Sequence, residues 1–287
     1  MSTNQTILIT GVTGHQGGAV AHALLGAGFS LRGLTRKPES DHAVALARQG
    51  VEIVKGDLDD EATLRSALAD TWGVFGVQNT WEAGVEREEE QGKRLATLAR
   101  EAGVQHYVYT SVGSAHRRTG IPHFENKWRI EDTVRSLGFP SHVILRPVFF
   151  MENLLAAYSL IGNNLTWAME PNTRLQMIAV EDIGWFGARA FTHAAALNHR
   201  EIDIAGDART MPEAAEILTQ NLRRPITFVQ ASIDQVRQYS QDTAIMLEWF
   251  DRVGYNVDIP GLEHEFGHRL LRLPEWASRQ SKHAKGA

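Results

Sequence analysis

The stretch Ile7-Leu-Ile-Thr-Gly11-Val-Thr-Gly14-His-Gln-Gly17-Gly18 reads as an apolar strand that runs into a glycine-rich turn. Residues 19–25 follow with the apolar spacing of a helix, which ends at Gly26-Ala-Gly28. Glycines in this spacing permit a tight turn, a close approach of backbone to a pyrophosphate, and close packing of helix on strand. Since the turn joins a strand to a helix, it indicates a dinucleotide site with the phosphates at the helix N-terminus, rather than an ordinary turn.

Strand and helix patterns alternate beyond this turn. We expect strands at residues 7–10, 31–35, 51–54, 73–77, 104–110 and 141–145, with helices at 43–48, 61–68, 86–101 and 127–137. Strands joined through such helices form a parallel sheet covered on both faces, so the sequence predicts an α/β, doubly wound Rossmann-type fold. The pattern is less regular after Asn153. We therefore expect a dinucleotide-binding domain over residues 1–153 and a smaller, less regular substrate-side α/β region over 154–287, from which the chain can return to the sheet.

Composition narrows the class of protein. The 287 residues carry a formal net charge of −5, which leaves no basic excess for a nucleic-acid partner. The chain has no cysteine, so disulfides, thiolate metal sites and a cysteine nucleophile are excluded. The N-terminal residues show no signal-peptide pattern, and no apolar run approaches a membrane span. We expect a soluble cytoplasmic protein that binds no membrane.

The end of the second expected strand bears on the choice of cofactor. It reads Leu34-Thr35-Arg36-Lys37-Pro38, with two cations and no acid. An acidic residue at this place binds the ribose hydroxyls of NAD, whereas a basic residue suits the 2′-phosphate of NADP. The sequence therefore favours NADP, with NADPH preferred over NADH; the alternative is that Arg36 and Lys37 are solvated loop residues.

A second motif lies near the C-terminus. His264-Glu265-Phe266-Gly267-His268 matches the H-E-x-x-H pattern of zinc enzymes. That pattern requires both histidines on one face of a stable helix, together with a third ligand downstream. Gly267 weakens a helix, and Pro260-Gly261 lie close before the motif. We therefore expect no metal site.

Several further motifs carry a resemblance to a known family. They are Gly11-Val-Thr-Gly-His-Gln-Gly-Gly18, Gly56-Asp-Leu-Asp-Asp60, Asn79-Thr-Trp-Glu82 followed by Gln91-Gly-Lys93, His123-Phe-Glu-Asn-Lys127, and Arg146-Pro-Val-Phe-Phe-Met-Glu-Asn153. Together they resemble the NmrA-like members of the atypical short-chain dehydrogenase/reductase superfamily, from the N-terminus to about residue 155 and thinly beyond. The arrangement is most similar to redox-sensing members that prefer NADPH, and more distantly to bacterial quinone and dye reductases.

The resemblance implies a role for each of a set of residues. The pyrophosphate would lie on Gly11, Thr13, Gly14, His15, Gln16 and Gly17, the 2′-phosphate on Arg36 beside Lys37, and the adenine against Asp57 and Leu58. Gln78, Asn79 and Trp81 would line the cofactor with Lys93 close by, Lys127 would reach the nicotinamide ribose, and Phe150, Met151, Glu152 and Asn153 would border the nicotinamide. Structural alternatives are a helix cap for Asp57, a sheet cap for Trp81, a solvated side chain for Lys93 and an exposed loop acid for Glu152.

The same resemblance raises a question about catalysis. Short-chain dehydrogenases place Tyr-x-x-x-Lys on the helix after the fifth strand and a serine at the end of that strand. Ser111 and Lys127 are in place as candidate catalytic residues, but His123 occupies the tyrosine position. His123 is either a proton donor or a wall residue beside Lys127, or the protein turns nothing over.

Two functions follow from these readings. The first is an oxidoreductase that passes hydride from NADPH to a small planar acceptor such as a quinone, a reaction that survives loss of the tyrosine. The second is a non-catalytic NADP(H) sensor that acts through a homodimer or a regulatory protein partner.

Overall fold

The computed structural model describes residues 5–283, with side chains as far as residue 280. The chain forms two compact units. The first comprises the chain up to His116, with Pro122–Arg146 and Ile183–Ile202; the second comprises Arg117–Ile121, Pro147–Asp182 and the chain from Asp203 onward. The first unit thus includes a segment from the second half of the sequence, Ile183–Ile202, which contributes to one helix and one strand.

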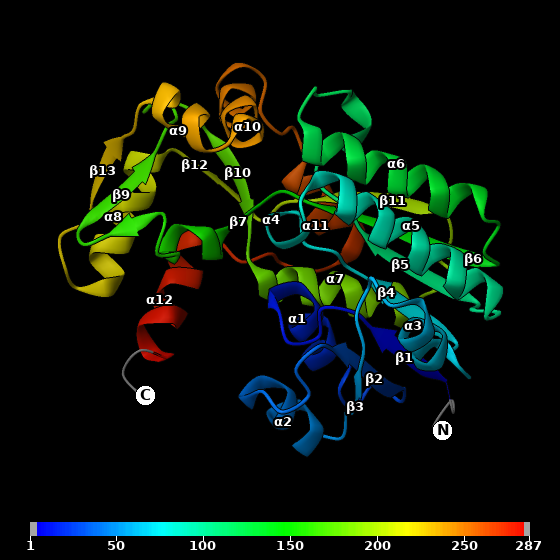
Figure 1. The fold of residues 1–287 in the computed structure, drawn as a ribbon. Coiled ribbons are helices and arrows are strands. Elements are labelled where there is room, and N and C mark those ends of the chain that lie inside the picture. Colours follow the sequence, from blue (N-terminus) through cyan, green and yellow to red (C-terminus); the bar gives the residue numbers. More distant parts are fainter. Residues whose placement is uncertain (1–4, 284–287) are drawn as a thin grey trace. The chain divides into compact units, whose positions relative to one another are not determined.

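The first unit is built on a seven-stranded sheet in the order β11-β6-β5-β4-β1-β2-β3, and neighbouring strands from β3 to β6 pair in parallel (Figure 1). The strands are β1 Thr6–Ile9, β2 Ser30–Thr35, β3 Glu52–Lys55, β4 Gly73–Gly76, β5 His106–Thr110, β6 Ser141–Pro147 and β11 Arg200–Ile204. The helices are α1 His15–Leu24, α2 Asp41–Arg48, α3 Glu61–Leu68, α4 Thr80–Ala83, α5 Val85–Glu101, α6 Pro122–Ser136 and α7 Val180–Thr192, with a short 3-10 turn η1 at Ala115–Arg117. The predicted α/β fold class is confirmed.

Both faces of this sheet are covered by helices. Apolar side chains of α3, α5 and α6 form one core with those of the strands, including Leu64, Leu95 and Ile130. A Cβ on Gly92 of α5 would lie 2.6 Å from Ile130 of α6, so the two helices meet at contact distance there. On the other face, a Cβ on Gly184 of α7 would lie 2.7 Å from the Ala19 carbonyl oxygen of α1.

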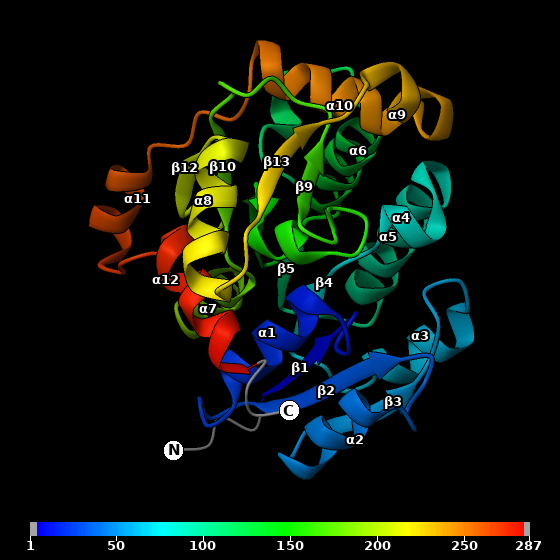
Figure 2. The same ribbon diagram turned by 90° about the vertical axis from the view of Figure 1, so that its left-hand side faces the viewer.

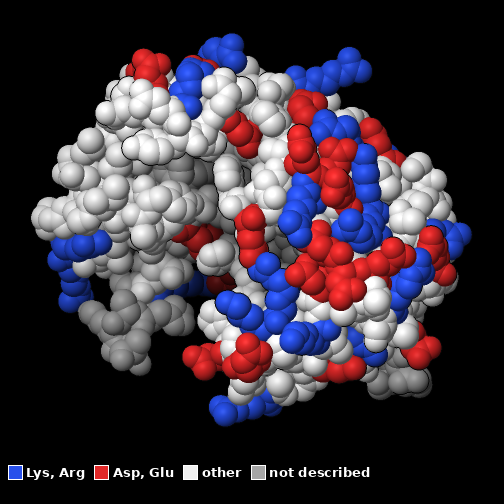
Figure 3. All heavy atoms as spheres, in the orientation of Figure 1, with Lys and Arg blue, Asp and Glu red and all other residues white. Residues whose placement is uncertain are grey.

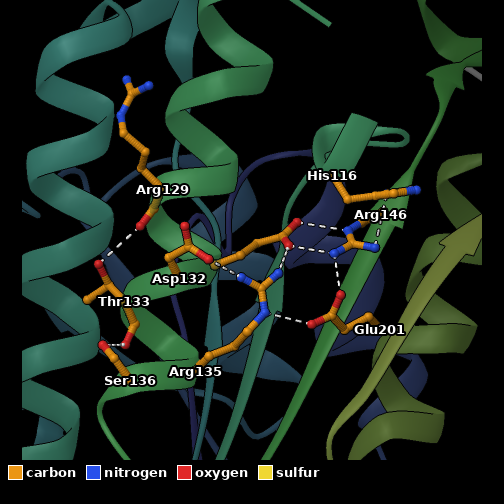
Figure 4. A network of polar contacts seen from close by, with 9 residues as sticks. His116, Arg129, Asp132, Thr133, Arg135, Ser136, Arg146 and Glu201 are labelled. Atoms are coloured by element: carbon orange, nitrogen blue, oxygen red, sulfur yellow. Dashed lines mark hydrogen bonds and ion pairs between the residues drawn. The ribbon is translucent and has the colours of Figure 1, made fainter. Parts of the chain in front are cut away.

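Helix α6 is also fixed by a buried ionic network (Figure 4). Glu131 of α6 is fully buried and accepts hydrogen bonds from Arg146 of β6 at 2.9 and 2.6 Å. Arg146 also pairs with Glu201 of β11, whose second carboxylate oxygen lies 2.6 Å from Nε of Arg135. Both guanidinium groups lie over the ring of Trp128. The Arg135 Cζ atom is 4.2 Å from the ring centroid, and the Arg146 Cζ atom is 5.7 Å from it. The network therefore ties α6 to β6 and β11, which lie at one edge of the sheet.

The second unit contains two small sheets, ordered β12-β10-β7 and β13-β9-β8. Its elements are β7 Phe149–Phe150, η2 Met151–Leu155, β8 Leu160–Ile161, β9 Asn164–Trp167, β10 Leu175–Ile178, β12 Asp207–Arg209, α8 Met211–Leu222, β13 Thr227–Gln230, α9 Ile233–Tyr239, α10 Gln241–Arg252, α11 Ile259–Phe266 and α12 Leu273–His283. Figure 2 shows β9 and β13 side by side, with α8 alongside them. Helix α8 begins at a capping box, in which the side chains of Thr210 and Glu213 each accept from the other's backbone N–H.

One buried histidine of the first unit should make the free energy of unfolding depend on pH. His106 of β5 is fully buried between Trp72 and Phe191, and burial lowers its pKa to about 4 from 6.5. As the pH falls from 6.5 towards 4, the unfolded chain binds a proton at this position and the native protein does not, so stability is lost. We predict that His106→Phe abolishes about 2–3 kcal/mol of the acid-induced loss between pH 7.5 and 4.5.

Urea unfolding of both proteins across this pH range measures the difference. His15→Phe, at an exposed histidine, is the control and should follow the wild type. Parallel pH profiles for wild type and His106→Phe would contradict the prediction.

Candidate functional site

The glycine turn has the geometry of a backbone that lies close to an anion. Gly11 has a φ of 56°, which favours glycine. A Cβ on Gly17 would lie 2.4 Å from the Gly11 carbonyl oxygen, so any larger residue would push α1 away from the turn. No side chain caps the N-terminus of α1 at Gly14, and its first turn holds no acid. The turn therefore leaves backbone N–H groups and a positive helix end for a negatively charged group.

The turn is also tied to the strands beside it. The Thr110 hydroxyl at the end of β5 donates to Gln16 Oε1 at 2.6 Å, and the Thr10 hydroxyl donates to the Val77 carbonyl oxygen at 3.0 Å. His15 is exposed and Thr13 half-buried. The predicted pyrophosphate residues therefore lie at the carboxyl ends of the central strands, where ligands of such sheets bind.

The basic pair after β2 has an acidic neighbour that the local sequence does not show. The Arg36 guanidinium is ion-paired with Glu82 of α4, and both side chains are exposed. Lys37 is exposed as well. The residues directly after β2 are Arg36, Lys37 and Pro38, yet an acid reaches Arg36 from a helix 46 residues further on. An exposed pair of this kind contributes about 0–1 kcal/mol, so a phosphate can displace it.

The residues predicted around the adenine have structural contacts of their own. Asp57 Oδ1 accepts from the Asp59 backbone N–H at 3.0 Å, and the cap of α3 is Asp60 rather than Asp57. The Leu58 carbonyl oxygen accepts from Arg94 at 2.8 Å. Lys93 Nζ lies 2.6 Å from Glu89 on the same helix. Lys93 is 42 % exposed, which fits the expected alternative of a solvated lysine.

Two buried polar side chains at the ends of β4 and β5 are unsatisfied. Gln78 is 6 % exposed, and neither its amide nitrogen nor its amide oxygen has a hydrogen-bond partner among the described residues. The same holds for the hydroxyl of Ser111, which is 4 % exposed. The register that pairs Gly76 with Tyr109 places Gln78 opposite Ser111 when it is extended by two residues. Each unsatisfied group costs about 1–3 kcal/mol, a cost that a hydrogen-bonding ligand would remove.

Lys127 is held by a buried carboxylate. Its Nζ lies 2.5 Å from Oε1 of Glu88, which is fully buried on α5. The other carboxylate oxygen accepts from Asn126 Nδ2 at 2.9 Å and from the Thr80 hydroxyl of α4. Burial raises the pKa of Glu88, but the charge of Lys127 and these hydrogen bonds outweigh burial and leave that pKa below its usual range. Glu88 is therefore ionised and joins α4, α5 and α6.

Sequence reasoning did not single out Glu88, although a signal for it exists. The stretch Glu86-Arg-Glu88-Glu-Glu90 reads as a solvated charged face. Glu88 nevertheless lies seven residues before Leu95, at a position on the apolar stripe that Gly92, Leu95 and Ala99 mark. A charge on that stripe is the sign of a buried, paired group.

His123 lies on the same face of α6 as Lys127, because four residues separate them. It is 5 % exposed. Its ring is 5.1 Å from that of Trp81 and meets Phe124 edge-on at 4.8 Å. Trp81 is 64 % exposed and follows Asn79, whose side chain caps α4 by accepting from the Trp81 backbone N–H. The His123 ring thus contacts the aromatic rings of Trp81 and Phe124.

The residues predicted at the nicotinamide end lie in the second unit, in β7 and η2. Glu152 is not an exposed loop acid: it is half-buried, and its Oε1 accepts from the Val180 backbone N–H at 3.1 Å and from Trp276 Nε1 at 2.9 Å. Asn153 Oδ1 accepts from the Tyr158 hydroxyl at 3.1 Å. Phe150 is half-buried and Met151 fully buried.

The H-E-x-x-H motif does not lie within one helix. His264 belongs to α11, which ends at Gly267 with a φ of 60°. His268 follows that end, and its Nε2 is 3.3 Å from Asp182 Oδ1. Within residues 5–283, no group of three or more histidine, aspartate or glutamate side chains is arranged to hold a metal ion, and no helix there is long and apolar enough to cross a membrane.

Comparison with known proteins gives a consistent set of relatives. A model of the NmrA-like family matches residues 3–279. An NmrA-like family domain-containing protein of Dictyostelium discoideum is 23% identical over 94% of this chain and 95% of its own. The NmrA-like family domain-containing oxidoreductase FrzB of a Cladobotryum species is 34% identical over 52% of this chain and 48% of its own, so the match spans about half of that protein's length.

Solved structures share the fold. Triphenylmethane reductase of a Citrobacter species, complexed with NADP(H), has a TM-score of 0.78 at 18% identity and covers 96% of this chain and 99% of its own. The NADPH-dependent quinone oxidoreductase of Escherichia coli has a TM-score of 0.76 at 24% identity, with the same coverage. The negative transcriptional regulator NmrA, in complex with NAD, reaches 0.79 at 18% identity over 99% and 98%.

The Lys127–Glu88 pair should reveal itself in stability. Lys127→Met leaves a buried, uncompensated carboxylate, and we predict a loss of about 3–5 kcal/mol at pH 7. Adding Glu88→Gln should restore most of that loss, because a neutral pair needs no counter-ion. The deficit of the single variant should also shrink as the pH falls and Glu88 takes up a proton.

Urea unfolding of the wild type, both single variants and the double variant measures this coupling. Losses that simply add in the double variant would show that the two side chains do not depend on each other.

Proposed function

The chain belongs to the NmrA-like family, and from that premise we propose that it is an NADPH-binding oxidoreductase that transfers hydride to a small planar acceptor such as a quinone. The observation that carries this proposal is the row of features at the carboxyl ends of β1, β4 and β5. It joins an uncapped glycine turn to two unsatisfied buried side chains, Gln78 and Ser111. A long ligand with phosphates at one end and amide and hydroxyl groups at the other fits that row. NADP(H) is such a ligand.

The proposed binding roles follow the contacts of each residue. The backbone from Gly11 to Gly17 takes the pyrophosphate, and Arg36 with Lys37 takes the 2′-phosphate after Glu82 moves aside. Lys127 donates to the nicotinamide ribose, and Gln78 and Ser111 hydrogen-bond near the nicotinamide.

The chemistry asks little of the protein. Bound NADPH supplies the hydride, and the chain holds the cofactor, orients the acceptor and excludes water. The rings of His123 and Trp81 lie 5.1 Å apart at an interplanar angle of 55° and offer aromatic contacts to a planar acceptor. The relatives and structural neighbours include proteins named as oxidoreductases, a quinone oxidoreductase and a triphenylmethane reductase, which supports this class of acceptor.

A non-catalytic NADP(H) sensor is the second candidate. It is favoured by the histidine at the tyrosine position and by the structural likeness to NmrA, a transcriptional regulator. In this case the binding of the cofactor would change which protein partner the chain binds, or its oligomeric state. Over α5 and α6, basic and acidic side chains are interspersed (Figure 3), as in the ion pairs of Glu89 with Lys93 and Arg129. That surface suits a protein partner better than a nucleic acid.

Cofactor preference tests the role of Arg36. We predict that NADPH binds more tightly than NADH and that Arg36→Ala weakens NADPH by about 1–3 kcal/mol while leaving NADH nearly unchanged. Glu82→Gln should tighten NADPH binding slightly, because the guanidinium is then free of its carboxylate. Calorimetry with both nucleotides measures these effects.

A matched control is Arg65→Ala, which removes an arginine of similar exposure that is paired with Glu61. Its nucleotide affinities should equal those of the wild type. Equal affinity of the wild type for NADPH and NADH would refute the preference.

Turnover separates the two candidate functions. We predict that the wild type oxidises NADPH in the presence of quinones and that His123→Phe, which keeps an aromatic ring at this position, changes the rate little. A proton donor at this position would instead lose about 10²–10⁴-fold. Absorbance of NADPH across a panel of quinones, dyes and carbonyl compounds gives the rates. Firm binding of NADPH with no oxidation by any acceptor would favour the sensor.

A further inference from the structure

Glu88 is a fully buried carboxylate of the first unit that is paired with a lysine of the candidate site. It is fully buried and charged, at a place where α5 and α6 already pack through Gly92 and Ile130. A buried ion pair contributes little stability in comparison with apolar side chains of similar volume. Two apolar residues would therefore hold these helices as well. What the pair adds is a fixed position for a cation.

The fixed cation is the ammonium group of Lys127. A lysine side chain has four rotatable bonds, and a free one would lose that freedom when it binds a ligand. Glu88 Oε1 accepts one of the three ammonium protons at 2.5 Å, which leaves two for other acceptors. The Lys127 side chain is 12 % exposed, so the ammonium is held in place and still reachable. A preorganised donor of this kind binds ribose hydroxyls at a lower entropic cost.

The same carboxylate also holds the segment that carries Trp81. Its second oxygen accepts from the Thr80 hydroxyl, and Thr80 lies between Asn79 and Trp81 in the first turn of α4. Trp81 in turn contacts His123, one helical turn before Lys127. One buried group therefore contacts both the cation and the segment that carries Trp81.

We propose that Glu88 is a positioning residue: its carboxylate fixes the Lys127 ammonium for binding the ribose of NADP(H). This inference rests on the proposed function. It assigns to Glu88 an effect on nucleotide affinity that acts through Lys127 and not through general stability of the fold.

A double-mutant cycle tests the proposal by calorimetry with NADPH. Glu88→Gln should raise the Kd about tenfold and Lys127→Met about 10–100-fold, as expected for hydrogen bonds to a charged group. Because Glu88 acts through Lys127, the double variant should bind within about twofold of Lys127→Met alone. Losses that multiply in the double variant would overturn the proposal.

Glu131→Gln is the matched control. Glu131 is equally buried and paired with an arginine, and it lies on the same α6 helix as Lys127. This variant should lose stability in urea yet bind NADPH within about twofold of the wild type. If it weakens NADPH as much as Glu88→Gln does, the effect of Glu88 is a general loss of α6 packing, and the positioning role is wrong.

A second variant decides the matter if Glu88→Gln does not fold. Glu88→Asp keeps the charge but draws the ammonium back by one methylene group, and we expect a Kd at least about threefold higher, since small misplacements are costly. An unchanged Kd would overturn the proposal. Failure of the wild type itself to bind NADPH would overturn the proposed function together with this inference, whereas firm wild-type binding with any of the other contrary results would overturn this inference alone.

Discussion

Two fully buried carboxylates, Glu88 of α5 and Glu131 of α6, are the constraint from which the arrangement of the first unit follows. Glu88 reaches α6 from α5 and meets Lys127, and Glu131 leaves α6 and meets Arg146 of β6. A buried charge without a partner is so costly that each of these pairs must form for the chain to fold in this way. The Glu131–Arg146 pair therefore ties α6 to β6 (Figure 4), and the Glu88–Lys127 pair ties it to α5.

The edge of the sheet where a ligand would bind contains buried polar groups that have no hydrogen-bond partner. The buried carboxylates Glu88 and Glu131 are paired, whereas the neutral groups of Gln78 and Ser111, like the hydroxyls of Tyr107 and Tyr109 in β5, are buried without hydrogen-bond partners in the described part of the chain. Folding tolerates a neutral unsatisfied group more easily than a charged one, because its desolvation costs far less. The exposed Arg36–Glu82 pair is weaker still and can exchange partners. The buried ion pairs of Glu88 and Glu131 thus hold the helices in place, whereas Gln78, Ser111 and Arg36 are available to bind a ligand.

The sequence predicts those parts of the structure that depend on local periodicity. Residues 7–10 were expected as a strand and form β1 at Thr6–Ile9, and residues 86–101 were expected as a helix and form α5 at Val85–Glu101. The two-residue strands β7 and β8 are too short for an alternating pattern, so no such signal was available for them. Helices α9 and α10 meet at Ser240, which follows the end of α9 and caps the start of α10.

Partners in the candidate site were harder to predict than elements. Glu82 reaches Arg36 across 46 residues of chain, and Glu88 reaches Lys127 across 39. Such contacts depend on the order of strands in the sheet, which hydrophobic periodicity does not encode. The sequence allows Glu152 to be either a neighbour of the nicotinamide or an exposed acid. Its contacts with Val180 and Trp276 depend on tertiary packing within the second unit, which local sequence does not show.

The pairing of Lys127 also affects the electrostatics at position 123, where short-chain dehydrogenases have a tyrosine. In a short-chain dehydrogenase the lysine lowers the pKa of the neighbouring tyrosine through its positive charge. In this chain the Glu88 carboxylate lies 2.5 Å from the ammonium, so the pair presents almost no net charge to position 123. A tyrosine there would gain little activation as an acid from such a pair. Under the proposed function, the pair would hold and orient the nucleotide, and hydride transfer to a quinone-like acceptor needs no proton from position 123.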